Sequence, residues 1–261
     1  MPQDLIGRRA NFDGAPVLFV PGSFSTLQAW RGVQKHIPES VRVFNTCLLG
    51  YGDMTETRSR ADFAMEHQIR ALVATAHEIG EPVHLVAHSF GGTVAMAALL
   101  SGMVEGLSLT TFEANPVAIL GQKGGGELFE SVQQLAERFE AAHLAGSPDA
   151  AAMIIDYWGG EGVFASLPAA VQDYCRQTAG TNVLDWLTAI DFRPDLSDFQ
   201  RLDLPVLLAR GGLANAAMIA VTDILAAAIP NAQTAVVDGA NHFLISSHAH
   251  DCARLLQRNI I

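Results

Sequence analysis

The residues best placed to do chemistry surround Ser89. A short apolar run, Val83–Val86, leads into Ala87–Gly92 (AHSFGG), after which the chain becomes an Ala-rich helical pattern. A small residue two positions before a serine and a glycine two positions after it are typical of a nucleophile elbow, a sharp strand-to-helix turn. Such a turn strains the serine backbone and exposes its hydroxyl above the sheet edge. We therefore predict that Ser89 is a nucleophile.

The elements around Ser89 predict an α/β fold with a mostly parallel sheet covered by helices on both faces, because short apolar strands alternate with longer helical patterns. The expected strands are residues 17–20, 41–47, 82–87, 107–112, 205–209 and 233–237. The expected helices that accompany them are residues 27–37, 61–79, 92–100, 216–228 and 247–258.

Between about residues 117 and 192 the strand pattern disappears and only helices are expected, over 128–144, 149–157 and 168–178. This predicts a core of residues 1–116 and 196–261 with six principal strands, and a helical cap of residues 117–195. Asp185, Asp191 and the aromatic residues Trp158 and Trp186 fall in the predicted cap.

Composition excludes several classes of function. The 261 residues are 49% apolar and 16% charged, as in a folded globular protein, and 27 acidic side chains against 16 basic ones give a net charge of −11. An acidic chain without a Lys/Arg cluster is not expected to bind nucleic acid or anionic membranes. We expect a soluble cytoplasmic protein for three reasons: the three cysteines are scattered, residues 1–15 show no signal-peptide pattern, and the sequence has no long apolar run.

Four motifs in this order resemble the α/β-hydrolase superfamily across nearly the whole chain. They are the loop Pro21–Phe24 (PGSF), the loop Gly50–Gly52 (GYG), the Ser89 elbow, and Gly239–His242 (GANH) after the last strand. The resemblance implies acyl transfer to water, with Ser89 attacking an ester-type carbonyl. It also implies that His242 is the general base that takes the proton from Ser89.

The resemblance leaves the third catalytic residue at an unusual place. Most members carry an aspartate after the strand that is expected here at 205–209, but the following residues, Gly211–Ala216, contain no carboxylate. A minority carry the acid after the strand that follows the elbow helix, where this chain has Glu113. A carboxylate there needs a partner, and a histidine N–H would be one. We predict Glu113 as the orienting acid, with Asp185, Asp191 and Asn215 as alternatives.

The resemblance also implies an oxyanion hole made by the backbone N–H groups of Phe90 and Ser23, with Phe24 as the alternate to Ser23. These steps need no metal or organic cofactor. His248 and His250 lie two positions apart, hence on different helix faces, and no metal is expected there. We expect a small or medium apolar substrate under the cap. A cofactor-free peroxidase, a C–C hydrolase, a synthase and a non-enzymatic receptor remain alternatives.

Overall fold

The computed structural model describes residues 14–122 and 126–260. Its centre is a sheet of six parallel strands in the order β2-β1-β3-β4-β5-β6 within the described part of the chain. The strands are β1 Val17–Val20, β2 Val43–Asn45, β3 Val83–His88, β4 Gly106–Phe112, β5 Val206–Gly211 and β6 Ala232–Val237. The predicted fold class is confirmed. The first 13 residues of the predicted core, with most of the stretch inspected for a signal peptide, lie outside the described residues.

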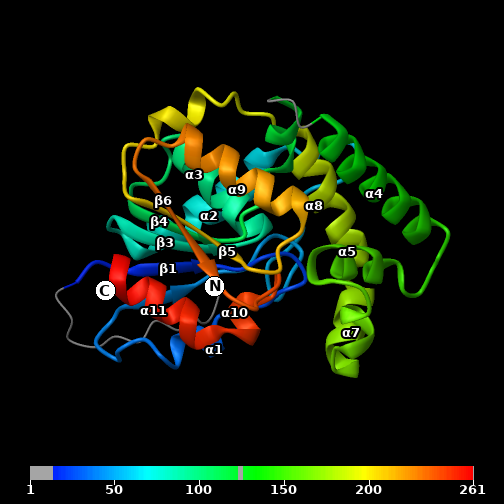
Figure 1. The fold of residues 1–261 in the computed structure, drawn as a ribbon, viewed down its shortest axis with the longest axis horizontal. Helices are drawn as coiled ribbons and strands as arrows, with labels where there is room; N and C mark the ends of the chain where they lie inside the picture. Colours follow the sequence, from blue (N-terminus) through cyan, green and yellow to red (C-terminus); the bar gives the residue numbers. More distant parts are fainter. Residues whose placement is uncertain (1–13, 123–125, 261) are drawn as a thin grey trace.

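Helices pack on both faces of the sheet (Figure 1). One face carries α2 Met65–Ile79, α3 Phe90–Leu100 and α9 Ala216–Ala228, and the other carries α1 Arg31–Gln34, α10 Leu244–Ser247 and α11 Ala249–Asn259. The apolar core accordingly divides into two clusters, one on each side of the sheet. Burial on both faces explains why the central strands read as continuous apolar runs.

The chain between β4 and β5 is helical and lies beside the sheet (Figure 1). It comprises η1 Val117–Gln122, α4 Gly126–Leu144, α5 Ala150–Gly159, α6 Val163–Ser166, α7 Ala169–Gln177, α8 Ala179–Asp191 and η2 Asp198–Arg201. Helix α8 was not predicted, because its first turn contains Gly180, Thr181 and Asn182, which are weak helix formers. Buried contacts to α4 and to the core hold it instead.

Three further expectations about helices were wrong in extent. The helix predicted over 61–79 begins only at Met65, since Asp62 forms an isolated β-bridge with Ser59. The helix predicted over 27–37 is only α1, since residues 27–30 form turns. The helix predicted over 247–258 is preceded by the separate short helix α10, and His248 between α10 and α11 has a non-helical backbone. None of these differences moves the carboxyl ends of the strands, where an open parallel sheet places its ligands.

Candidate active site

Three loops at the carboxyl ends of β1, β3 and β4 carry unusual backbone strain. Among the described residues, the non-glycine residues with positive φ are Phe24 (56°), Ser89 (53°) and Glu113 (52°). Such a conformation costs about 1–3 kcal/mol and persists only where the surroundings enforce it. Three of them at neighbouring strand ends mark this edge of the sheet as a constructed site.

Ser89 stands between β3 and α3. Its N–H donates to the carbonyl oxygen of Phe112 (3.1 Å), which fixes the turn to the neighbouring strand β4. The turn is tight, because a Cβ added at Gly91 would lie 2.1 Å from the carbonyl oxygen of Pro21. The small residues of the elbow thus let α3 start directly against the loop after β1. The Ser89 hydroxyl faces the loop that follows β6.

His242, in the loop after β6, accepts a hydrogen bond from that hydroxyl. The Ser89 Oγ donates to His242 Nε2 at 2.9 Å, and His242 Nδ1 donates to Glu113 Oε2 at 2.7 Å. Because an ionised carboxylate only accepts hydrogen bonds, Glu113 keeps the proton on Nδ1 and leaves Nε2 free to accept. Both side chains are almost completely buried. The arrangement can draw a proton from Ser89 and return it to a leaving group.

Glu113 is held from two sides. Its Oε2 faces His242, and its Oε1 accepts the backbone N–H of Gly211 at the end of β5 (2.7 Å). The carboxylate therefore has a partner on each oxygen in a buried setting, as a buried charge requires.

The alternatives to Glu113 as the third catalytic residue make other contacts than one to His242. Asp185 contacts Ser23 and Arg58, and Asn215 caps α9 by accepting from Met218 N (2.9 Å). Asp191 is exposed at the end of α8, beside a second, smaller hollow.

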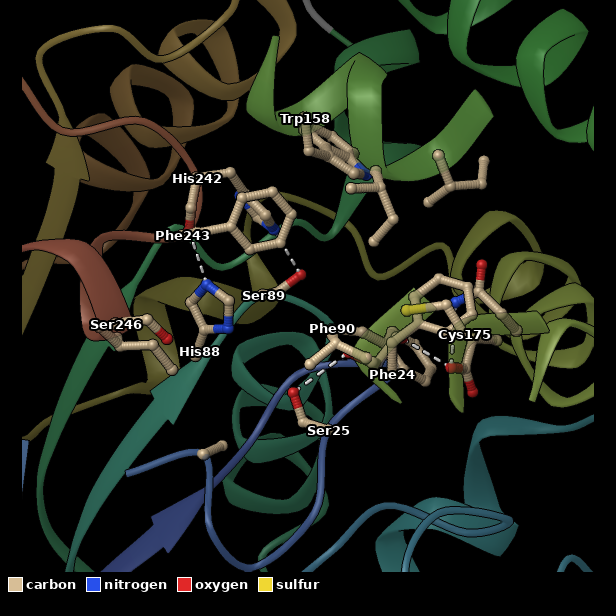
Figure 2. A pocket seen from close by; sticks show the side chains of 18 of the residues that line it. Phe24, Ser25, His88, Ser89, Phe90, Trp158, Cys175, His242, Phe243 and Ser246 are labelled. Carbon is tan, nitrogen blue, oxygen red and sulfur yellow. Dashed lines mark hydrogen bonds between the residues drawn. The ribbon is translucent and has the colours of Figure 1, made fainter. Parts of the chain in front are cut away.

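A cavity of about 540 Å³ opens above Ser89 (Figure 2). Its wall is largely apolar and comes from the strand-end loops and from α5, α7 and α8. Trp158 stacks on the imidazole of His242, with ring centroids 5.2 Å apart and an interplanar angle of 25°. Trp186 stacks in turn on Trp158 (6.2 Å, 12°). An apolar ligand of moderate size would fit between these rings and Ser89.

Other nucleophilic groups line the same cavity but are not hydrogen-bonded to the ring of His242. The Ser23 hydroxyl donates to Asp185, and the Ser25 hydroxyl donates to the carbonyl oxygen of Ser23. Burial raises the pKa of Cys175 to about 11, so its thiol stays protonated at neutral pH. Among the described residues that line the cavity, Ser89 is the hydroxyl bonded to the ring of His242.

The comparisons with known proteins establish the family and the fold. The model of the Alpha/beta hydrolase family matches residues 17–255. The chain belongs to this family. The comparison with curated protein sequences gives no match.

Solved structures resemble this alpha/beta hydrolase in fold. An alpha/beta hydrolase from Sphaerobacter thermophilus has a TM-score of 0.71 at 21% identity, with 96% of this chain and 94% of that chain covered. A thermophilic esterase from Thermogutta terrifontis has a TM-score of 0.73 at 20% identity, covering 95% and 89%. MenH from S. aureus has a TM-score of 0.74 at 18% identity, covering 96% and 97%. At these identities the likeness establishes the fold alone.

In this alpha/beta hydrolase Asn115 was missed as a contact of the nucleophile, and the sequence did not show which contact His88 makes. Asn115, two positions after Glu113, donates from Nδ2 to Ser89 Oγ (3.4 Å), and Thr93 donates to its Oδ1 (3.3 Å). His88 donates from Nε2 to the carbonyl oxygen of His242 (2.9 Å) and so holds the loop of the base. Adjacency to Glu113 and Ser89 was the only signal in the sequence.

His88 is uncharged in the folded alpha/beta hydrolase. Burial, and secondly the neighbouring His242, lower the pKa of His88 to about 3. A neutral ring at this position adds no positive charge beside the imidazole that must accept the proton of Ser89.

The oxyanion-hole candidates occupy the loop after β1 and the start of α3. Phe90 is the first residue of α3, and the first N–H groups of a helix have no partner within the helix. Gly22 packs on the elbow, since a Cβ there would lie 2.8 Å from Ser89 Cβ. Ser23 and Phe24 both follow Gly22 and line the cavity. In Figure 2, Phe24 and Phe90 lie on the other side of Ser89 from His242.

Two further observations concern membrane-spanning helices and metal-binding clusters. Within residues 14–122 and 126–260, no helix is long and apolar enough to cross a bilayer. The same residues hold no cluster of three or more His, Cys, Asp or Glu side chains arranged to bind a metal ion.

Proposed function

We propose that this alpha/beta hydrolase is a serine hydrolase that cleaves an ester-type bond of a small or medium apolar substrate through an acyl-enzyme. The observation that supports this most is the continuous chain of hydrogen bonds from Ser89 through His242 to Glu113. A serine hydroxyl is a weak nucleophile until a base accepts its proton, and this chain supplies the base and fixes its tautomer.

In the first half of the reaction, Ser89 Oγ attacks the carbonyl carbon while its proton passes to His242 Nε2. The carbonyl oxygen becomes an oxyanion, bound by the N–H groups of Phe90 and Ser23, with Phe24 as the alternate donor. One such donor contributes on the order of 3 kcal/mol to the transition state. The bond to the leaving oxygen then breaks, and His242 returns the proton to the departing alcohol, which leaves an acyl ester on Ser89.

In the second half, water repeats the same steps. It gives its proton to His242 Nε2, attacks the acyl carbon, and forms a second oxyanion in the same hole. Collapse releases the acid and returns the proton to Ser89. Glu113 stays ionised throughout and stabilises the imidazolium that forms twice.

The substrate class follows from the cavity. Its apolar wall and its volume of about 540 Å³ suit an uncharged ester with short or medium chains rather than a polymer. We propose that residues 117–195 act as a cap that shields the acyl-enzyme from bulk water, over a core of residues 1–116 and 196–261. Helices α5, α7 and α8 contribute the wall opposite the strand ends.

The test is covalent labelling with a fluorophosphonate probe. The wild type is expected to label, Ser89→Ala is expected to lose the label, and Ser246→Ala is the matched control. Ser246 lines the same cavity but lies in α10 without a bond to His242 among the described contacts, so its removal should leave labelling intact. A wild type that neither labels nor hydrolyses p-nitrophenyl butyrate would refute the proposal and favour a ligand receptor.

A further inference from the structure

A buried carboxylate from the helical segment contacts the candidate oxyanion loop. Asp185, in α8, is almost fully buried, and its Oδ2 accepts from Ser23 Oγ and from Tyr51 OH, each at 2.6 Å. Its Oδ1 accepts from Arg58 Nη2 at 2.8 Å. Asp185 thus joins α8 to loops that follow β1 and β2, at separations of 127 to 162 residues along the chain.

Arg58 balances the charge of Asp185. Its guanidinium is fully buried, donates to both oxygens of Glu56, and donates from Nη1 to Thr188 on α8 (3.1 Å). Burial alone would lower the pKa of Arg58, but the carboxylates of Asp185 and Glu56 outweigh it and raise the pKa, so the guanidinium stays charged. Burial raises the pKa of the Asp185 carboxyl, and the charge of Arg58 is the largest influence that opposes this rise. The one guanidinium is shared between the carboxylates of Asp185 and Glu56.

Stability alone does not explain this pair. A buried ion pair costs desolvation, and an apolar replacement of similar volume is often as stable or more so. The charges also have no part in the proton transfers of Ser89 and His242. What the pair does is present a fixed acceptor to the Ser23 hydroxyl at the edge of the cavity.

The loop that carries Ser23 needs such a restraint. Phe24 has a positive φ of 56°, and Gly22 has no room for a side chain against Ser89. Strained backbone is retained only where contacts enforce it. Two hydrogen bonds hold this loop. The Ser23 hydroxyl donates to Asp185 on α8, and the Ser25 hydroxyl of the loop itself donates to the Ser23 carbonyl oxygen (3.2 Å).

We infer that Asp185, paired with Arg58, is a positioning residue that aims the oxyanion-hole N–H of the loop after β1 through the Ser23 hydroxyl. The hole is then complete only when α8 is docked on the core. This inference rests on the proposed serine hydrolase function. A displaced donor is costly, because misplacement by about 1 Å lowers rates by roughly 100-fold.

The chain offers a matched pair of variants. Ser23→Ala and Tyr51→Phe each remove one hydroxyl that lies 2.6 Å from the same Asp185 oxygen, but Tyr51 does not line the cavity. Ser23→Thr keeps a hydroxyl in the loop. We would measure kcat and KM on p-nitrophenyl butyrate, inhibition by butylboronic acid, whose tetrahedral adduct resembles the transition state, and hydrogen exchange of the amides of residues 22–25.

The inference expects Ser23→Ala to lower kcat and boronic acid affinity by about 10- to 100-fold, with KM changed by less than about twofold. Ser23→Thr should recover most of the loss, and Tyr51→Phe should stay within about twofold of the wild type in kcat. Loss of equal size in Tyr51→Phe, or unchanged kcat in Ser23→Ala, would overturn it.

Failure of the proposed function is separable from failure of this inference. A wild type without turnover or fluorophosphonate labelling would refute the hydrolase, and hydrogen exchange would then decide the positioning role by itself. Faster exchange at residues 22–25 in Ser23→Ala but not in Tyr51→Phe supports it, and equal exchange in both overturns it.

Discussion

Replacing Glu113 by Gln tests the proposed triad most directly, because the two side chains have the same shape. In the Glu113→Gln variant the amide oxygen can still accept the Gly211 N–H, which places the amide nitrogen toward His242 Nδ1. An amide NH₂ only donates, so Nδ1 must lose its proton and Nε2 must carry it. His242 would then present a donor to Ser89, and it could not act as a base.

The magnitude follows from charge and tautomer together. The imidazolium formed during attack lies beside the Glu113 carboxylate, and a pair of unit charges about 4 Å apart is worth about 4 kcal/mol at an effective dielectric constant of about 20. At about 1.4 kcal/mol per factor of ten, this alone lowers kcat by about 10³-fold. The wrong tautomer brings the expected loss toward about 10⁴-fold, the size of the matching Asp-to-Asn change in the trypsin-type triad.

The assay is kcat and KM on p-nitrophenyl butyrate, with thermal unfolding to verify the fold. Asn215→Ala is the control, since Asn215 lies after β5, near the usual place of the acid, but only caps α9 and contacts the Tyr157 carbonyl oxygen. It should cost about 1 kcal/mol of stability as a lost N-cap and leave kcat within about twofold. A loss below about tenfold in Glu113→Gln, or an equal loss in the control, would refute the triad.

Two further predictions concern the base loop and the cavity wall. Because burial lowers the pKa of His88 to about 3 while an unfolded histidine titrates near 6.5, the unfolded chain binds the extra proton between these values. The free energy of unfolding should therefore fall as pH drops below about 6.5, by up to about 1.4 kcal/mol per pH unit. The His88→Gln variant, which can still donate to the His242 carbonyl oxygen, should lose this part of the pH dependence when urea unfolding is measured from pH 7 to 5. Equal pH dependence in the variant and the wild type would contradict a neutral His88. The Trp186→Leu variant should enlarge the cavity and raise kcat/KM for hexanoate esters relative to butyrate esters by up to about fourfold per added methylene. The control Leu187→Ala, whose side chain lines the smaller hollow across α8, should leave this ratio unchanged. A changed ratio in both variants would contradict the assignment of Trp186 to the cavity wall.

The sheet was predictable because each strand can be recognised from its own short stretch of sequence. Each buried parallel strand needs an apolar run, and such runs at β1, β3 and β5 stand out against their polar or glycine-rich ends. Predicted and observed strand ends differ by two residues or fewer. Helix α8 was not predictable in this way, because it starts with weak helix formers and is stabilised by packing on α4 and the core.

The contacts around the oxyanion loop were beyond sequence reasoning for a different reason. Ser23 and Asp185 are 162 residues apart, and neither belongs to a motif that names the other. An aspartate in a predicted cap reads equally well as a surface charge, an acid for His242 or a partner for arginine. Only the packing of α8 against the loops after β1 and β2 distinguishes these roles.

The position of Glu113 shows why the acid can change strands within one fold. Strands β4 and β5 are neighbours in the sheet, with Phe112 paired to Ala209, so the residues after them face the same space beside His242. Most members of the family are expected to carry a carboxylate in the loop after β5. In this chain the Gly211 N–H at the end of β5 instead donates to the carboxylate of Glu113, which follows β4. Glu113, whose backbone has a positive φ of 52°, reaches that shared space with a hydrogen bond on each carboxylate oxygen. In this chain the residue after β4 supplies the acceptor and the last residue of β5 supplies a donor, so an acid introduced into the loop after β5 would compete with Glu113 for the place beside His242 Nδ1.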